Sequence, residues 1–121
     1  PVAATWAAMC KFGEKGYVET TRQIVGATRQ IAKGIKDIDD IEVVGRSDIC
    51  CVAFAGTKAS GLNCYAIADC MRQRFHWDLQ TCQNPPCVHL ALTLPSSRNV
   101  DTFLLQLKAA VEEVQPAGSR L

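Results

Sequence analysis

His89 is the first of the few residues in this chain that could do chemistry. It follows the proline pair Pro85-Pro86 and lies on the polar side of an alternating segment, where a ligand or another domain could reach it. A lone histidine on a strand is more often a structural residue, and that alternative stays open. His76 lies beside Trp77 where a helix should end, and a partly positive imidazole is favourable there without any further role.

The seven cysteines are many for 121 residues, but their spacing fits neither a disulfide framework nor a metal site. The count is odd and no CxxC is present, so buried, reduced thiols in a cytosol-facing protein are the expected state. A zinc site on Cys82, Cys87 and His89 would need a fourth ligand that the sequence does not supply. We therefore predict no metal site.

Two further motifs resemble binding sites only in part. The Gly-Thr-Lys sequence at 56–58 follows an expected strand but lacks the glycine spacing of a P-loop, so Lys58 is expected to be a solvated turn residue. The acidic residues of 37–42 have no histidine partner, which favours a wet surface over a site for a hard cation. Taken alone, the residues do not describe an enzyme.

The composition limits the classes of partner. The chain has 13 Lys and Arg against 12 Asp and Glu, a net charge of +1, and no run of one sign. Neither a nucleic acid nor an anionic membrane is therefore expected to bind it. No apolar run approaches the ~20 residues of a membrane helix, and no signal peptide is visible. Small ligands and protein surfaces remain, for a chain of one domain's length.

An amphipathic helix over residues 13–38 is the longest element expected. Its apolar residues recur at steps of three and four, which predicts one buried stripe. The stripe consists of Tyr17, Val18, Ile24, Val25, Ile31, Ala32, Ile35 and Ile38. Gly13 and Gly16 interrupt the pattern, so the upstream segment is expected to be a separate element.

The segment 1–12 is apolar on nearly every side if it is helical, which is unusual at the end of a small domain. Its large side chains are Trp6, Met9 and Phe12. We expect them to pack against an absent or oligomeric neighbour rather than to line a ligand pocket. They are thus the predicted association surface.

The rest of the chain alternates strands and helices. Strands are expected at 41–45, 49–56, 77–82 and 87–94, and helices at 62–75, with Ser60 or Asn63 as N-cap, and after the N-cap Asn99. The connections are mostly too short for parallel crossovers. We therefore predict an α+β fold: a two-layer sandwich with a mainly antiparallel four-stranded sheet and helices on one face.

Three regions carry a resemblance to a known family. They are WAAM at 6–9 running into FGEKGYV at 12–18, QNPPCVH at 83–89, and NVDTF at 99–103. Together they resemble the C-terminal part of the sphingosine-1-phosphate lyase family, in the pyridoxal-phosphate-dependent group II decarboxylase superfamily. The resemblance covers nearly the whole chain, and the Gly-Glu-x-Gly-Tyr motif at 13–17 is its most specific part.

The resemblance implies a fragment of a larger enzyme of the aspartate-aminotransferase-like fold. Residues 1–13 would end a missing large domain, 14–115 would form the C-terminal small domain, and 116–121 a tail. In the family, pyridoxal phosphate is held by a lysine that follows a histidine in the large domain. No lysine here follows a histidine. No catalytic or cofactor-binding residue is therefore assigned, and no cofactor is expected in the fragment.

For the full-length protein, the resemblance implies a homodimeric carbon-carbon lyase that cleaves sphingosine 1-phosphate to a fatty aldehyde and phosphoethanolamine. The expected location is cytosol-facing, with the endoplasmic reticulum membrane left open. The candidates for facing the cofactor cleft are His89, Pro85 and Pro86. Two alternatives remain: a free-standing α+β binding or oligomerisation module, and the small domain of a pyridoxal-phosphate-dependent amino-acid decarboxylase.

Overall fold

The computed structural model describes residues 1–114 of the chain. The elements follow in the order α1 (Val2–Lys36), β1 (Ile41–Val44), β2 (Cys51–Gly56), α2 (Cys64–Phe75), β3 (Gln80–Gln83), β4 (Pro86–Ala91), the 3-10 helix η1 (Ser96–Arg98) and α3 (Val100–Val114). The predicted tail at 116–121, and residue 115 of the predicted small domain, lie outside the described residues.

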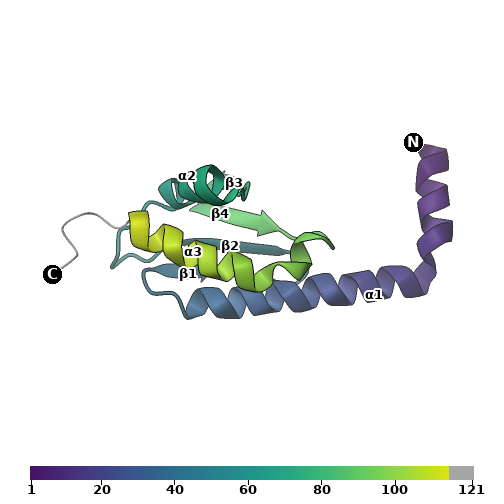
Figure 1. The fold of residues 1–121 in the computed structure, drawn as a ribbon, viewed down its shortest axis with the longest axis horizontal. Helices are drawn as coiled ribbons and strands as arrows, with labels where there is room; N and C mark the ends of the chain where they lie inside the picture. Colours follow the sequence, from purple (N-terminus) through teal and green to yellow (C-terminus); the bar gives the residue numbers. More distant parts are fainter. Residues whose placement is uncertain (115–121) are drawn as a thin grey trace.

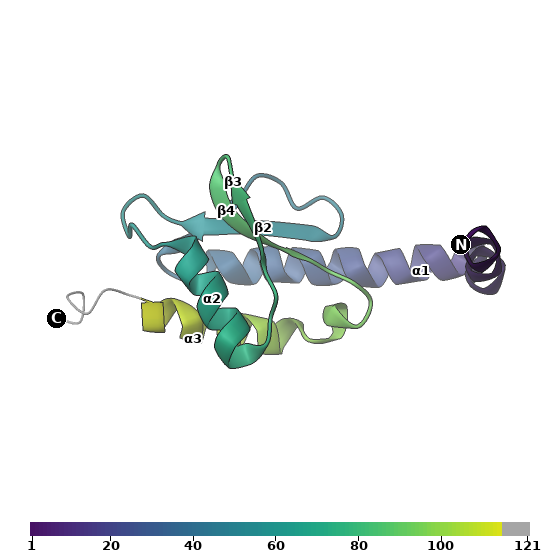
Figure 2. The same cartoon turned by 90° about the horizontal axis from the view of Figure 1, so that it is seen from above.

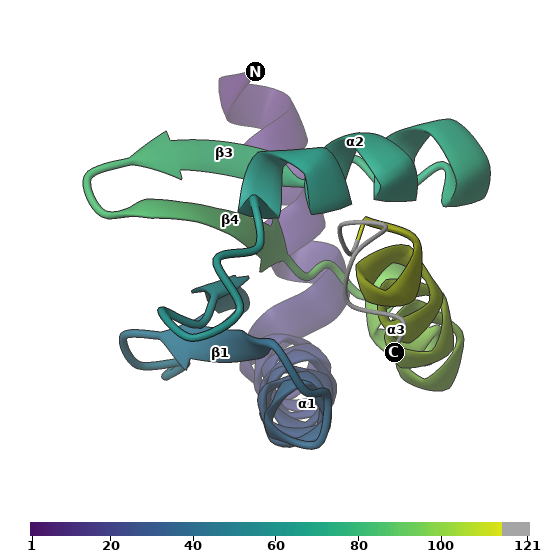
Figure 3. The same ribbon diagram turned by 90° about the vertical axis from the view of Figure 1, so that its left-hand side faces the viewer.

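The four strands form one sheet in the order β1-β2-β4-β3, and each neighbouring pair is antiparallel. All three α-helices lie on one side of this sheet, as seen along the long axis of the molecule (Figure 3). The structure therefore confirms the predicted α+β sandwich with helices on one face. Among residues 1–114, no helix lies on the opposite face of the sheet (Figure 3).

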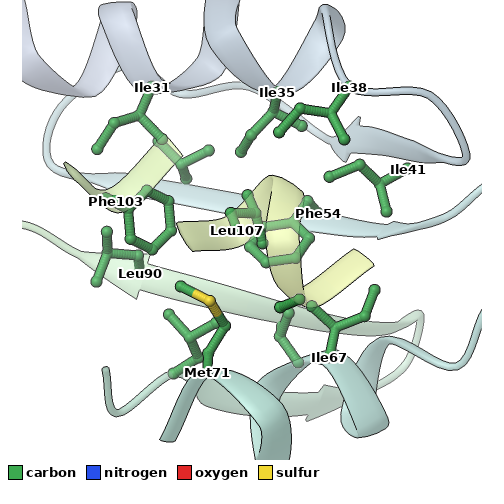
Figure 4. Close-up of a cluster of buried hydrophobic side chains, with 14 of the residues drawn as sticks. Ile31, Ile35, Ile38, Ile41, Phe54, Ile67, Met71, Leu90, Phe103 and Leu107 are labelled. Carbon is green, nitrogen blue, oxygen red and sulfur yellow. The ribbon is translucent and has the colours of Figure 1, made fainter. Parts of the chain in front are cut away.

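The core lies between the sheet and the helices (Figure 4). Alternation along the strands sends Phe54 of β2 and Leu90 of β4 toward the helices, where both are buried. Each helix adds two large buried side chains, which are Ile31 and Ile35 from α1, Ile67 and Met71 from α2, and Phe103 and Leu107 from α3. The apolar stripes predicted from helical periodicity thus meet in one core.

Helices α1 and α3 are in contact at Gly34. A Cβ atom at this position would meet the side chain of Leu104. A glycine in the middle of a helix lowers its intrinsic stability, so here the cost is offset by packing that a larger residue would prevent. At Gly26, by contrast, an added Cβ atom would meet no other part of the chain within 4 Å.

A kink at Gly13 divides α1 into two helical segments. Gly13 has φ 62° and ψ 178°, a backbone conformation that L side chains rarely adopt. Residues 2–12 stand at a steep angle to the rest of α1, which projects well beyond the sheet (Figures 1 and 2). The predicted break before the long helix is confirmed.

The buried stripe of α1 is shorter than its sequence pattern predicted. Tyr17 is 45% exposed and Val18 is 51% exposed, whereas Ile31 and Ile35 are at most 1% exposed. The prediction is wrong for the first two residues because the helix extends past the elements that could cover them. Apolar periodicity shows which face needs a partner, and here the described chain supplies none.

Several element boundaries also differ from the prediction by a few residues. The third strand was expected at 77–82, but β3 begins at Gln80. Trp77 instead packs edge-on against Phe103, with ring centroids 5.0 Å apart, and its Nε1 donates to Oε1 of Gln106 at 2.7 Å. The Oδ1 of Asn63 accepts from the Tyr65 amide, which confirms this residue as the N-cap of α2.

Asn99 precedes α3 as predicted, but its side chain is used differently. Its Nδ2 donates to the carbonyl oxygen of Pro95 at 3.4 Å, while its backbone carbonyl accepts from the Phe103 amide. The short η1 turn between β4 and α3 brings Pro95 within reach. The side chain therefore ties the turn to the helix start rather than capping free amides of α3.

Candidate functional site

The β3-β4 hairpin holds the predicted cleft-facing residues. Its turn contains a cis peptide bond between Asn84 and Pro85. Pro85 and Pro86 are exposed at the tip of the hairpin, and His89 lies farther along β4, where it is half-buried. The structure places the three residues on one hairpin but does not bring the prolines into contact with the histidine ring.

His89 lies on the sheet face that carries no helix, because its neighbours Val88 and Leu90 point into the core. It is directly opposite Ala53 of β2 and Gln80 of β3. The side chain of Ala53 is small, so the histidine is approachable from this face of the sheet. This agrees with the prediction that His89 lies opposite the apolar face.

The ring of His89 has a specific partner in Cys82. Its Nδ1 lies 3.3 Å from the Sγ of Cys82 on the neighbouring strand. The Cys82 carbonyl oxygen accepts a 2.6 Å hydrogen bond from the Tyr65 hydroxyl, which fastens β3 to helix α2. Cys82 thus links the edge strand β3 to β4 through its thiol and to α2 through its carbonyl oxygen.

Cys87 completes a cluster with these two residues, since it pairs directly with Cys82 across the hairpin. Burial raises the pKa of the Cys87 thiol, and the charge of the adjacent Cys82 thiol and a hydrogen bond to it raise it further. Across residues 1–114, no three His, Cys, Asp or Glu side chains are arranged to hold a metal ion.

The burial predicted for the cysteines is wrong for most of them. Among the seven, only Cys64 and Cys87 are buried, and Cys10 and Cys51 are exposed. The error arises because small residues in apolar stretches were assigned to the core, although alternate residues of a strand point to opposite faces. All seven are free thiols in the structure.

The predicted association surface is exposed. Trp6 is 68% exposed, Met9 57% and Phe12 48%. The Phe12 ring lies 5.6 Å from that of Tyr17 across the kink, so the apolar surface continues onto the second segment of α1. A groove of about 360 Å³ runs over the first segment, lined by Pro1, Val2, Thr5, Trp6 and Met9. Nothing in the described chain covers these side chains.

The remaining sequence motifs have structural roles. His76 ends α2 with φ 61°, and its amide donates to the Arg72 carbonyl. Lys58 is exposed in a turn, as predicted. In the acidic loop, the Asp40 carbonyl accepts from the Thr57 amide and from the Ser60 hydroxyl, so the loop before β1 is bonded to the connection that follows β2.

The sequence did not predict the contact between Cys82 and His89. It grouped these residues only as two ligands of an incomplete zinc site. The signal was present in the short turn at 84–85, because a hairpin that reverses there pairs residue 82 with 87 and residue 80 with 89. The contact between Tyr65 and Cys82 had no sequence signal, since it joins residues from different elements. None of the helices described between residues 1 and 114 is long and apolar enough to span a membrane.

The chain is similar to known proteins over almost its whole length, although no family model matches it. It is 38% identical over 114 residues to the sphingosine-1-phosphate lyase of Arabidopsis thaliana, a match that covers 94% of this chain and 20% of that protein. The chain therefore spans about a fifth of the length of the curated relatives that it matches.

Solved structures give the same result. The sphingosine-1-phosphate lyase of Burkholderia pseudomallei K96243 is 29% identical, with a TM-score of 0.84 over 98% of this chain and 26% of that one. A Lactobacillus brevis glutamate decarboxylase shares the fold at 15% identity, with a TM-score of 0.79 over 93% of this chain and 27% of that one. By sequence and by structure, nearly the whole chain is similar to the C-terminal part of sphingosine-1-phosphate lyases.

Proposed function

We propose that this chain is the small C-terminal domain of a pyridoxal-phosphate-dependent lyase that cleaves sphingosine 1-phosphate to a fatty aldehyde and phosphoethanolamine. The observation that carries the proposal is the match of 94% of the chain to one fifth of a sphingosine-1-phosphate lyase. The reaction requires the whole enzyme, so the domain is inactive alone. Its partners are the large domain of the same polypeptide and a second copy of the full-length protein.

The cofactor would be held outside this chain. Pyridoxal phosphate forms a Schiff base with a lysine, which needs a site that is shielded from water. The six lysines here, Lys11, Lys15, Lys33, Lys36, Lys58 and Lys108, are all exposed, and none follows a histidine. These lysines therefore do not fit the cofactor, and no step of the reaction is expected at them.

The domain's share of the function is to cover the cleft in which the large domain holds the cofactor. The helix-free face of the sheet supports this role, since it presents small side chains such as Ala53 and Ala91 around a half-buried His89. The exposed Pro85 and Pro86 extend the same hairpin. The large domain would pack on this face and bring His89 to the edge of the cleft.

The segment 1–13 would belong to the large domain. Trp6, Met9 and Phe12 have the apolar area of a core but no cover within the described chain. This exposure argues against a free-standing module, which would need its first 12 residues covered by its own chain. The amino-acid decarboxylase alternative has support in fold alone, because the decarboxylase match is 15% identical.

The first experiment is a titration of the purified chain with pyridoxal phosphate, followed by borohydride reduction and peptide mass mapping. We expect no stoichiometric adduct on any one lysine, because no enclosed lysine is present among the described residues. Stoichiometric labelling of a single lysine would mean a complete cofactor site within 121 residues and would overturn the proposal.

The second experiment joins the chain to the upstream part of its polypeptide and measures aldehyde release from sphingosine 1-phosphate. In that protein, His89→Ala should lower kcat/KM by about tenfold to a hundredfold if the ring positions groups at the cleft. His76→Asn is the matched control, since asparagine tolerates the positive φ of that position. Equal activity of both variants would show that His89 does not act at the cleft. The lyase assignment itself is tested separately, by whether the joined protein releases aldehyde.

A further inference from the structure

We propose that Cys82 and Cys87 are a peroxide-oxidisable thiol pair that closes to a disulfide across the β3-β4 hairpin, with His89 as the base that activates Cys82. The proposal does not depend on the lyase reaction, because it rests only on the geometry of this hairpin. It assigns a modification site to Cys82 and Cys87, which have no role in the proposed function.

The backbone allows the bond. Cys82 and Cys87 are directly opposite in an antiparallel pair, so their side chains lie on the same face of the sheet. Opposite residues in such pairs have Cα atoms about 4.5 to 5.5 Å apart, and disulfides span Cα separations of about 4.4 to 6.8 Å. The contact of the Cys82 Sγ with the Nδ1 of His89, at 3.3 Å, places the Cys82 side chain on the sheet face that Cys87 and His89 share.

Burial divides the roles of the two thiols. Cys82 is half-buried on the edge strand, whereas Cys87 is 4% exposed on the inner strand. Peroxide can therefore reach Cys82 first, and Cys87 is positioned to resolve the product from within the sheet. The Nδ1 of His89, 3.3 Å from the Cys82 Sγ, can accept the thiol proton in the tautomer protonated on Nε2.

The chemistry balances with one hydrogen peroxide. The Cys82 thiolate attacks one peroxide oxygen, the O–O bond breaks, and the departing hydroxide takes the proton held by His89, which leaves a sulfenic acid and one water. The Cys87 sulfur then attacks the Cys82 sulfur, the S–O bond breaks, and the hydroxide leaves with the Cys87 proton as a second water. Two thiols are oxidised to one disulfide, and the peroxide is reduced.

Other thiol arrangements in the described chain do not offer the same combination. Cys50 and Cys51 have sulfurs 4.0 Å apart, but the two residues are adjacent in sequence rather than opposite each other on neighbouring strands. Cys70 is half-buried like Cys82, but its neighbours are Glu113 and Arg74 rather than a second thiol. Cys70 is therefore the matched control for reactivity without a resolving partner.

The sequence makes the test direct, since trypsin releases residues 75–98 as one peptide that contains both Cys82 and Cys87 and no other cysteine. The 121-residue chain is treated with hydrogen peroxide, alkylated and digested. We expect this peptide to become lighter by two hydrogen atoms and to lose both alkylation sites, before the peptide carrying Cys70 changes. Alkylation of both cysteines in 75–98 after Cys70 has been oxidised would overturn the proposal.

Two variants separate the roles. Cys87→Ser should stop the reaction at a sulfenic acid on Cys82, which dimedone traps, and failure to trap it would contradict the assignment of Cys82 as the attacking thiol. His89→Asn should slow disulfide formation by about tenfold, because the thiolate is the nucleophile. The control His76→Asn should leave the rate unchanged. An equal rate in His89→Asn and the parent would remove His89 from the mechanism.

Discussion

The two segments of helix α1 both carry large apolar side chains, but these side chains have opposite surroundings. In the segment that crosses the sheet, Ile31 and Ile35 are almost fully buried, whereas Trp6 and Met9 beyond the kink are more than half exposed. The sheet and α3 supply the cover in the first case, and nothing in the described chain supplies it in the second. The same side-chain chemistry thus marks a core at one end of the helix and an interface at the other.

The largest effect should come from testing this contrast with matched truncations on the one helix. Ile35→Ala should lower the free energy of unfolding by about 2 to 5 kcal/mol, because it removes buried methyl groups and leaves a cavity. Val18→Ala, at a position that is 51% exposed, should change it by less than about 0.5 kcal/mol. Urea unfolding followed by circular dichroism measures both.

A loss at Val18→Ala comparable to that at Ile35→Ala would break the comparison, since it would mean that the exposed part of α1 next to the kink is covered in solution. Coverage by a second copy of the chain would then be visible as a dependence of the unfolding midpoint on protein concentration.

A smaller effect should follow from filling the contact between α1 and α3. Gly34→Ala should destabilise the chain by about 1 to 3 kcal/mol, because the new methyl group would meet Leu104. Gly26→Ala, in the same helix but in open space, should be stabilising by about 0.5 to 1 kcal/mol through helix propensity. Thermal unfolding of the two variants should shift in opposite directions.

A second substitution checks the cause. Leu104→Ala in the Gly34→Ala background should recover part of the loss, because it removes the atoms that the new methyl group meets. Additive losses in the double variant would show that Gly34 is required for a reason other than close approach to α3.

The fold was predictable from sequence wherever periodicity and turn residues agreed. The alternation of Val88, His89 and Leu90 predicted which side chains face the core, and the apolar stripe of α3 predicted its buried side. Gly13 predicted the break in α1, because the combination of φ 62° with ψ 178° is open essentially to glycine alone. These signals are local, so a single sequence contains them.

The site was less predictable because its contacts join separate elements. The spacing of Cys82, Cys87 and His89 suggested a metal site with a missing ligand, and the structure instead pairs two thiols and one imidazole across a hairpin. The prediction that Tyr17 and Val18 are buried was wrong for a related reason. A helical stripe specifies that a partner is needed, but the partner's presence depends on where the rest of the fold ends.

The smallest effect on stability should come from the exposed segment itself. Trp6→Ser combined with Met9→Ser should change the free energy of unfolding by less than about 0.5 kcal/mol, since both side chains are largely exposed. The same variant should lose any self-association that the parent chain shows in sedimentation equilibrium, because large exposed apolar surfaces associate. Leu105→Ser, at a position on α3 that is 72% exposed, is the control for a single exposed apolar residue of the domain body. If Leu105→Ser lost association to the same extent, the interface would not be specific to the segment before the kink. The exposure of Trp6 and Met9 would then not identify a docking surface.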